Sequence, residues 1–296
     1  MEKMTASPDL YGIFGYNIDY SLSPLIHNSI AKILNVNLCY GKFDITPDKF
    51  PTAIEGFKAL GLKGANITKP YKSEVLKYAD SLSAESETVG AVNTLKLEQD
   101  GGYRGYNTDI PGFIEAVNYE FNKSLKDSRV MLIGAGGASR AVLYALIKEN
   151  AGEVSIINRT FKNADILKKD ANKWKDLLKS PTEIFAFDFN QAAALKKFVS
   201  KNFDFIFNAV TPGAESCKLM KDTFSNLLGK NYFMDVSYSS AHYNYPKYAN
   251  GLSMLLFQAL ESFYIWTGKK LESGTIKNAL MAYFKNYKIY DKINKK

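Results

Sequence analysis

The sequence predicts an α/β fold that is large enough for two domains. Segments typical of strands and of helices alternate along the 296 residues. A glycine-rich turn near the middle of the chain, Gly134-Ala-Gly136-Gly137, joins a short apolar, partly β-branched run to an almost wholly apolar helix. Hydrophobic residues make up 46% of the chain, which is enough to fill a sizeable core. Together these features indicate a globular protein built from strand–helix units.

The composition argues against several classes of partner. The formal net charge is +8, but the lysines are scattered and form no basic stripe with interleaved aromatic residues, so we expect no nucleic-acid partner. No apolar run is long enough to span a bilayer, and the first residues lack an apolar signal region. Two cysteines, Cys39 and Cys217, and two histidines, His27 and His242, cannot build an ordinary structural zinc site. We therefore expect a cytoplasmic protein with no metal and no membrane partner.

The first strand–helix unit carries two serines at its junction. A strand is predicted over Leu10–Tyr16, and the helix after it has Ser23 as its expected N-cap, Pro24 at its first position and an apolar stripe at Ile26, Ile30, Ile33 and Leu34. If the segment from Ser21 to Ser23 is extended, both hydroxyls point the same way beside a helix N-terminus, a setting that suits a carboxylate. Plain capping by Ser23 is the alternative. We expect His27 to form local hydrogen bonds rather than to catalyse.

A lysine occurs where a cation is locally unfavourable. After a strand predicted over Leu38–Asp44 and a helix over Phe50–Leu60, a further strand ends near Thr68, and Pro70 is expected to open another helix. Lys72 then falls in the first turn of that helix, where the helix dipole opposes its charge and favours loss of its proton. A residue placed against local preference is a functional candidate. An exposed surface lysine is the alternative interpretation.

An acidic residue follows a predicted hairpin. Strands over Thr94–Glu98 and Tyr103–Tyr106 are joined by Gln-Asp-Gly-Gly, and Asp109 is the expected N-cap of a helix that runs to about Phe121. Capping is the ordinary role of such a residue. The functional hypothesis is that Asp109 is the carboxylate partner of Lys72.

The glycine-rich turn predicts a dinucleotide site. Gly134 permits the tight turn, Gly136 lets the backbone approach a pyrophosphate, and free N–H groups at the helix start can bind that anion. The third small position holds Ser139. A tight turn without a ligand is the alternative. The next strand, Glu153–Asn158, ends without the acidic residue that binds the ribose of NAD, and Arg159 after it suits the 2′-phosphate of NADP.

The rest of the chain continues the alternation. A Lys-rich helix is predicted over Lys162–Leu178, and later segments predict strands over 184–187, 203–208 and 232–236 and helices over 251–266 and 276–290. The loop Asn208–Gly213 follows a strand at its carboxyl end, where open α/β sheets bind ligands. This part of the chain is therefore expected to form a Rossmann-like, doubly wound parallel sheet.

In their order along the chain, these motifs resemble those of the shikimate dehydrogenase family. The matching segments are Ser21-Leu-Ser23-Pro24, Gly64–Lys72, Gly90–Thr94, Asn107-Thr108-Asp109, Gly134–Ala138, Asn158-Arg159-Thr160, Asn208-Ala209 and Gly251–Gln258. They span nearly the whole chain. The resemblance implies an α/β substrate-binding and catalytic domain, residues 1–109 plus 254–296, to which the C-terminal helices return. It also implies an NADP-binding domain, residues 110–253.

The resemblance also implies an activity. The family interconverts 3-dehydroshikimate and shikimate with NADPH, in the biosynthesis of aromatic amino acids, so the implied protein is an oxidoreductase with a small-molecule substrate. Lys72 and Asp109 are the implied catalytic pair. The residues that the resemblance assigns to the substrate are Ser21, Ser23, Thr68, Asn93, Asp109, Tyr238 and Gln258. Those that it assigns to NADP are Gly134, Ala135, Gly136, Gly137, Ala138, Asn158, Arg159, Thr160, Lys162, Val236 and Gly251.

The sequence departs from the family pattern at three places. Asn163 stands where a second basic residue for the 2′-phosphate is usual, Ser253 replaces a usual glycine, and the segment 239–250 is short. Two alternatives stay open: a quinate/shikimate dehydrogenase with relaxed cofactor choice, and a non-catalytic NADP-binding regulatory protein. Both serines of the first unit argue against the former, and the presence of Lys72 and Asp109 argues against the latter. The sequence leaves a homodimer open.

Overall fold

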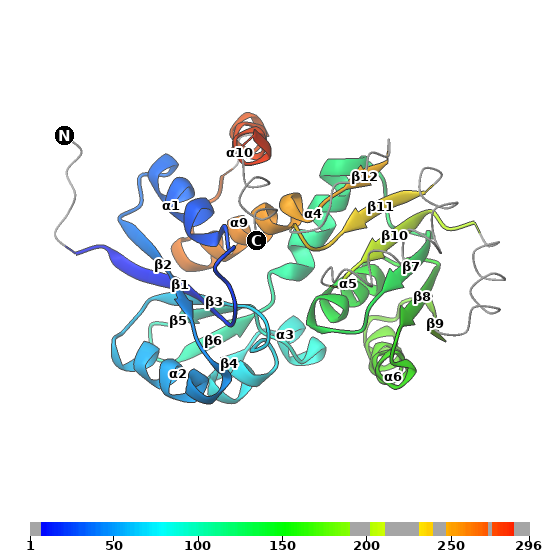
Figure 1. The fold of residues 1–296 in the computed structure, drawn as a ribbon, viewed down its shortest axis with the longest axis horizontal. Coiled ribbons are helices and arrows are strands. Elements are labelled where there is room, and N and C mark those ends of the chain that lie inside the picture. Colours follow the sequence, from blue (N-terminus) through cyan, green and yellow to red (C-terminus); the bar gives the residue numbers. More distant parts are fainter. Residues whose placement is uncertain (1–6, 190–201, 211–230, 239–246, 272–273, 287–296) are drawn as a thin grey trace. The chain divides into compact units, whose positions relative to one another are not determined.

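The computed structural model describes residues 7–189, 202–210, 231–238, 247–271 and 274–286. The chain forms two compact units, one made of Met1–Gly112 with Leu255–Lys296 and the other of Phe113–Met254. Each unit is organised around a six-stranded sheet with helices packed on it (Figure 1), so the predicted α/β fold is confirmed. None of the helices in these ranges combines the length and the apolar character that a membrane crossing requires.

The sheet of the first unit has the strand order β2-β1-β3-β5-β6-β4. The strands of this unit are β1 (Asp9–Gly15), β2 (Leu38–Asp44), β3 (Gly64–Ile67), β4 (Ser81–Leu82), β5 (Thr94–Leu97) and β6 (Tyr103–Tyr106). Its helices are α1 (Ser23–Ile33), α2 (Phe50–Ala59), α3 (Ala84–Val89), most of α9 (Leu252–Thr267), α10 (Gly274–Asn286) and the 3₁₀ helices η1 (Pro47–Lys49) and η2 (Glu74–Tyr78). Strands β1, β2 and β3 are parallel, whereas β5 is antiparallel to both β3 and β6. The predicted hairpin is therefore confirmed.

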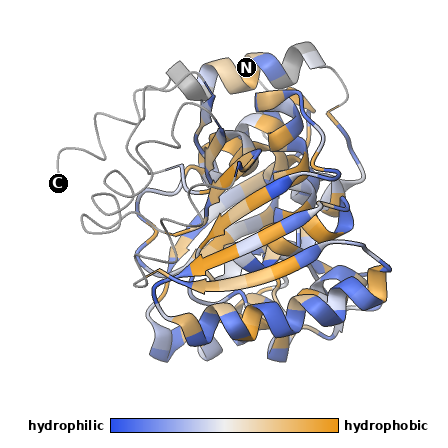
Figure 2. Ribbon diagram, turned by 90° about the vertical axis from the view of Figure 1, so that its right-hand side faces the viewer, coloured by the Kyte–Doolittle hydropathy of each residue, from blue (hydrophilic) through white to orange (hydrophobic). Residues whose placement is uncertain are grey.

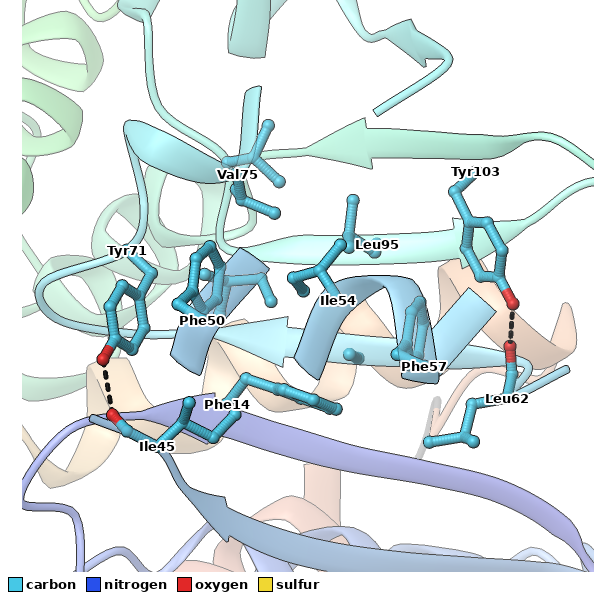
Figure 3. Close-up of a cluster of buried hydrophobic side chains, with 13 residues drawn as sticks. Phe14, Ile45, Phe50, Ile54, Phe57, Leu62, Tyr71, Val75, Leu95 and Tyr103 are labelled. Atoms are coloured by element: carbon cyan, nitrogen blue, oxygen red, sulfur yellow. Dashed lines mark hydrogen bonds between the residues drawn. The ribbon is translucent and has the colours of Figure 1, made fainter. Parts of the chain in front are cut away.

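One hydrophobic core of the first unit lies between α2 and the sheet (Figure 3). Its buried side chains include Phe14, Phe50, Ile54, Phe57, Tyr71, Val75, Leu95 and Tyr103. Two tyrosines of this core donate their hydroxyls to backbone carbonyls, Tyr71 to Ile45 and Tyr103 to Leu62, the latter at 2.6 Å. These bonds satisfy the only polar atom of each buried ring and anchor the loops that flank α2.

The second unit is a doubly wound parallel sheet with the order β12-β11-β10-β7-β8-β9. Its elements are most of α4 (Asp109–Phe121), β7 (Arg129–Ile133), α5 (Gly137–Lys148), β8 (Glu153–Asn158), α6 (Phe161–Leu178), β9 (Glu183–Asp188), β10 (Phe205–Asn208), β11 (Tyr232–Asp235) and β12 (Tyr248–Ala249). The chain winds outward from β7 to β9 and then places β10 on the opposite side of β7. Neighbouring strands pair in parallel throughout the described sheet, which confirms the predicted topology.

Apart from the partly buried edge strand β9, the strands of this sheet are mostly buried on both faces, as a covered parallel sheet requires. They are coloured mostly as hydrophobic in Figure 2. Every side chain from Ala141 to Ile147 in α5 is buried, which explains why this helix is apolar all round. Helix α6 instead buries one face. The Arg140 guanidinium of α5 lies over the Trp174 ring of this helix, 5.1 Å from the ring centroid. Asp170 of α6 also pairs with Arg140 at 2.9 Å.

One predicted helical stripe is only partly correct. Ile26 and Ile30 of α1 are fully buried, but Ile33 is 43% exposed because the helix ends at that residue. The last predicted helix is present as α10, and the part of the prediction beyond residue 286 lies outside the described residues.

Candidate active site

Four chain segments of the first unit meet at one edge of its sheet. Because β1 and β3 are parallel, the segments after their carboxyl ends, which carry Ser21 and Thr68, leave the sheet at the same edge. Strand β5 runs the opposite way, so its first residue, Thr94, and the preceding Asn93 lie at that edge too. Strand β6 runs back to the edge and leads into Asp109. The sheet topology therefore gathers candidate residues that are far apart in the sequence.

Lys72 and Asp109 form the ion pair that the functional hypothesis requires. Lys72 Nζ lies 2.6 Å from Asp109 Oδ2, and the two side chains are 19% and 9% exposed. The other carboxylate oxygen, Oδ1, accepts a hydrogen bond from Asn93 Nδ2 at 2.9 Å. Such charge-assisted bonds are about twice as strong as neutral ones. Both oxygens of the carboxylate are thus occupied by donors, while the ammonium keeps some exposure with which to meet a ligand.

Neither residue has the helical role that the sequence predicts. Residues 71–73 form a turn, and the 3₁₀ helix η2 begins only at Glu74, so Pro70 does not open an α-helix. Lys72 therefore does not oppose a helix dipole, and that argument for its function is wrong. Helix α4 begins at Asp109 itself, whose carboxylate bonds to side chains instead of capping the helix. The tertiary partners outweigh the local capping preference.

Asn93 is held in one orientation by donors on its oxygen side. Its Oδ1 accepts from the Thr108 N–H at 2.7 Å and from Thr94 Oγ1 at 3.0 Å, so its Nδ2 faces Asp109. The hydroxyls of Thr108 and Thr94 lie 3.0 and 2.9 Å from Ser262 Oγ of α9. Sequence analysis gave no role to Thr94 or Ser262. Ser262 lies four residues after Gln258 in α9, so the two share one face of the helix, and this spacing is the signal that points to it.

The two serines do not form the extended pair that the sequence predicts. Leu22 between them has helical backbone angles (φ −88°, ψ −7°), and α1 begins at Ser23 rather than at Pro24. The N-cap of α1 is thus Leu22 and not Ser23, and Ser21 Oγ accepts from the Ser23 N–H at 3.3 Å. Ser23 is buried and Ser21 is half-buried. Both hydroxyls nevertheless lie at the start of α1.

Thr68 and Gln258 also belong to this unit. Thr68 is half-buried directly after β3, and its N–H donates to the Phe14 carbonyl at 2.9 Å. Gln258 is buried in α9, which packs directly on the first turn of α4. A Cβ at Gly112 would lie 2.7 Å from Gln258 N, so glycine is required for this close approach. The contact places Gln258 beside the helical turn that carries Asp109.

His27 is a buried aromatic residue rather than a hydrogen-bonding one. Its ring stacks on Tyr40 with 4.3 Å between the ring centroids, and neither ring nitrogen is hydrogen-bonded within the described part of the chain. Burial lowers the pKa of the imidazole to about 3. The ring is therefore neutral at physiological pH, and the expectation of local hydrogen bonds is wrong.

In the second unit, the glycine-rich turn has the geometry of an anion site. Gly134 has φ +109°, a conformation that L side chains rarely adopt. Gly136 precedes α5, and a Cβ there would meet no atom within 4 Å. Protein packing therefore does not require this glycine, and the open space beside its backbone leaves room for a ligand to approach. The buried Ser139 accepts the Gly136 N–H at 3.3 Å, which accounts for a serine at the third small position.

Cationic side chains stand at the same edge of this sheet. Strands β7 and β8 are parallel, so the segment after β8 leaves the sheet beside the glycine-rich turn. Asn158 Nδ2 donates to the Thr160 carbonyl at 2.9 Å and shapes the turn on which Arg159 is exposed. Lys162 is exposed in the first turn of α6, and its neighbour Asn163 is exposed as well. This edge suits an anionic group.

Another cluster at this edge includes an aspartate that sequence analysis did not single out. Asp235, at the end of β11, is fully buried and accepts from Asn208 Nδ2 at 2.6 Å and Tyr248 Oη at 3.0 Å. These bonds join β10, β11 and β12. A Cβ at Gly251 would lie 2.1 Å from the Val236 carbonyl oxygen, so only glycine lets the chain before α9 lie on the end of β11. Val236 and Gly251, two residues assigned to NADP, are thus in direct contact.

The remaining candidates also lie in the second unit. Tyr238 is half-buried in the turn after β11. The shortened segment that follows it falls largely outside the described residues, from 239 to 246. Ser253 is buried in the first turn of α9, and its hydroxyl has no hydrogen-bond partner among the described residues.

Comparison with known proteins places the chain in one family. Three family models match it in order: a shikimate dehydrogenase substrate binding domain over residues 13–95, a shikimate / quinate 5-dehydrogenase model over residues 115–210, and a shikimate 5′-dehydrogenase C-terminal domain over residues 251–281. A shikimate dehydrogenase (NADP(+)) from Caldanaerobacter subterraneus subsp. tengcongensis is 35% identical over 278 residues, which cover 90% of this chain and 94% of the relative.

Two solved structures show the same likeness in three dimensions. A crystal structure of a shikimate dehydrogenase in complex with NADP+ is 31% identical, has a TM-score of 0.77, and matches over 98% of this chain and 97% of that one. A shikimate 5-dehydrogenase from Listeria monocytogenes in complex with shikimate and NAD is 28% identical, has a TM-score of 0.79, and matches over 95% and 99%. With its sequence, its two units and its motifs in agreement, this chain belongs to the shikimate dehydrogenase family.

Proposed function

We propose that this protein reduces 3-dehydroshikimate to shikimate with NADPH, reversibly, in the biosynthesis of chorismate and the aromatic amino acids. The observation that carries the proposal is the Lys72–Asp109 pair, 2.6 Å between Nζ and Oδ2, at the sheet edge that also holds the serines and Asn93. A relative named for this activity with NADP(+) is 35% identical over most of both chains, which supports the same assignment.

Most of the residues proposed to hold the substrate belong to the first unit. Ser21 and Ser23, at the start of α1, bind the substrate carboxylate, for which a helix N-terminus with two hydroxyls is a suitable site. The residues that contact the ring hydroxyls or the carboxylate are Thr68, Asn93, Asp109, Tyr238 and Gln258. In this proposal, residues 1–109 plus 254–296 are the substrate domain and residues 110–253 the NADP domain.

Lys72 handles the proton at the reacting oxygen. Bound NADPH would supply the hydride, and no metal is needed for that chemistry. As the ketone carbon is reduced, negative charge grows on its oxygen, where the Lys72 ammonium stabilises it and delivers a proton. In the oxidative direction Lys72 takes the proton back. Asp109 orients Lys72 through Oδ2 and bonds the reacting hydroxyl, while Asn93 holds Oδ1.

NADP is held at the carboxyl edge of the second sheet. The open space beside the Gly136 backbone and the N-terminus of α5 fit a pyrophosphate. Arg159, together with Lys162 three residues later in the first turn of α6, fits the 2′-phosphate. The residues proposed to contact NADP are Gly134, Ala135, Gly136, Gly137, Ala138, Asn158, Arg159, Thr160, Lys162, Val236 and Gly251. An exposed free thiol at Cys39 suits the reducing cytoplasm, where we place the enzyme.

A second candidate function is a quinate/shikimate dehydrogenase with relaxed cofactor choice. It is favoured by the exposed Asn163 in place of a second cation, and by a structural relative that was solved with shikimate and NAD. A non-catalytic NADP-binding protein is disfavoured, because such a protein has no need of an intact Lys72–Asp109 pair.

The test is the rate of cofactor reduction, followed by absorbance, for four pairings of shikimate or quinate with NADP+ or NAD+. Turnover mainly with shikimate and NADP+ supports the proposal. Strong turnover with quinate or NAD+ moves the assignment to the relaxed-specificity alternative. If folded protein that still binds NADP+ reduces the cofactor with none of the four pairings, the proposed catalytic function is wrong. The same preparation, measured by light scattering, decides whether the protein forms the homodimer that the sequence leaves open.

A further inference from the structure

The Asp109 carboxylate stands at the end of a one-way chain of hydrogen bonds. Tyr40 Oη donates to Asn66 Oδ1 at 2.7 Å, and Asn66 Nδ2 donates to Thr94 Oγ1 at 3.1 Å. Thr94 Oγ1 donates to Asn93 Oδ1 at 3.0 Å, and Asn93 Nδ2 donates to Asp109 Oδ1 at 2.9 Å. The chain thus crosses from β2 through β3 and β5 to the start of α4.

The direction of this chain follows from groups that can only donate or only accept. Asn93 Oδ1 also accepts from the Thr108 backbone N–H at 2.7 Å, which fixes the amide with its nitrogen toward Asp109. Asn66 Nδ2 also donates to the Asn93 carbonyl at 3.2 Å, which fixes that amide with its oxygen toward Tyr40. Among the described groups around Thr94 Oγ1, Asn93 Oδ1 is the one that cannot donate, so it is the natural acceptor of the single threonine proton.

Every member of the chain is buried. Thr94 is 0% exposed, and Asn93 and Asp109 are 2% and 6% exposed. In a dry environment such bonds are stronger than in water, and successive bonds polarise one another. Burial raises the pKa of the Tyr40 phenol well above its usual range, which keeps Tyr40 a donor. Because Thr94 has no exposed surface, it has no contact with a ligand and can act only through its neighbours.

We propose that Thr94 is a positioning residue for the reaction. By donating to Asn93 Oδ1, its hydroxyl holds the Asn93 amide so that Nδ2 engages one oxygen of Asp109 and leaves the other oxygen for Lys72. Ser262 completes the arrangement from α9: its Oγ accepts from Asn66 Nδ2 at 3.0 Å and lies 2.9 Å from Thr94 Oγ1. The proposal rests on the proposed role of the Lys72–Asp109 pair.

The test compares Thr94→Val, which removes the hydroxyl at nearly constant shape, with Thr94→Ser, which keeps it. We expect Thr94→Val to lower kcat for shikimate oxidation about tenfold, the loss of roughly one buried hydrogen bond, with KM for shikimate changed less than about twofold. Thr94→Ser should restore kcat to within about threefold of wild type. Thr182→Val is the matched control, since Thr182 is also fully buried, its hydroxyl 2.9 Å from Ser180 Oγ in the second unit. It should lower Tm without lowering kcat.

A crystal structure of each variant gives a readout that does not depend on turnover. Thr94→Val should displace the Asn93 amide and lengthen its 2.9 Å contact with Asp109 Oδ1, whereas Thr94→Ser should retain it. An unmoved amide together with wild-type kcat in Thr94→Val overturns the positioning role. If the wild-type protein fails to oxidise shikimate but the amide still moves in Thr94→Val, the positioning role stands and the proposed function is what fails.

Discussion

Replacing Asp109 with asparagine should remove most of the activity with only a modest loss of stability. Both carboxylate oxygens accept hydrogen bonds, Oδ1 from Asn93 Nδ2 at 2.9 Å and Oδ2 from Lys72 Nζ at 2.6 Å. An asparagine side chain has one acceptor, so in either orientation its NH₂ group faces a donor. The unsatisfied donor costs about 1–3 kcal/mol, which corresponds to a decrease in Tm of roughly 2–10 °C.

The effect on catalysis should be larger. Without the carboxylate, Lys72 loses the partner that orients its ammonium, and losses of a positioned proton-transfer group are typically about 10²–10⁴-fold. We expect a decrease of that size in kcat/KM for shikimate, measured from initial rates of NADP+ reduction. Asp165→Asn is the control, because Asp165 forms an ion pair of similar length, 2.7 Å, with Lys169 on the surface of α6. It should change neither rate nor Tm appreciably. Cooperative melting of Asp109→Asn with kcat/KM within about threefold of wild type would refute the catalytic role.

Three further predictions concern the cofactor site and stability. Gly136→Ala should weaken NADP+ binding at least about tenfold but leave Tm nearly unchanged, because the added Cβ meets no atom within 4 Å. Gly251→Ala should lower Tm, because its Cβ would lie 2.1 Å from the Val236 carbonyl oxygen. Equal Tm values for the two variants would contradict this prediction. Arg159→Ala should raise KM for NADP+ about 10–100-fold and KM for NAD+ by less than about threefold, because it removes a charge-assisted contact to the 2′-phosphate, which NAD lacks. Equal changes in the two KM values would exclude Arg159 from phosphate recognition. The free energy of unfolding should fall by about 2 kcal/mol between pH 6.5 and pH 5 because of His27. Burial holds the folded pKa of His27 at about 3, so only the unfolded chain gains the proton in that range. In denaturant titrations the His27→Phe variant should lose this pH dependence, and an unchanged pH slope in that variant would contradict the prediction.

Local patterns locate the framework of the fold well. The runs Leu38–Asp44 and Glu153–Asn158 become strands with those bounds. In the second run, the buried β-branched residues Val154, Ile156 and Ile157 leave few other options. The glycine-rich turn lies between β7 and α5 as predicted, since the positive φ at Gly134 has few alternatives to glycine.

Local rules fail where tertiary partners compete for the same side chain. Capping and dipole arguments assign Ser23, Lys72 and Asp109 to helix ends. In the structure Leu22 is the N-cap in place of Ser23, Lys72 precedes a 3₁₀ helix, and Asp109 bonds to Lys72 and Asn93. The contact between Thr94 and Ser262 joins residues 168 positions apart. No periodicity in the sequence records such a contact, because it exists only once α9 packs on the sheet.

The geometry of the proposed catalytic pair therefore depends on how α9 packs on the sheet. A Cβ at Gly64 would lie 2.4 Å from Trp266 Nε1 and 2.8 Å from the Leu95 carbonyl oxygen, and Trp266 Nε1 donates to that oxygen at 2.9 Å. Glycine in β3 thus lets α9 lie against β3 and β5, one helical turn from Ser262. The same pairing sets Asn66 opposite Thr94, and a one-residue slip of β5 would turn Thr94 to the other face of the sheet. The link from Asn66 through Thr94 to the Asn93–Asp109 bond would then be lost, although no residue of the Lys72–Asp109 pair had changed.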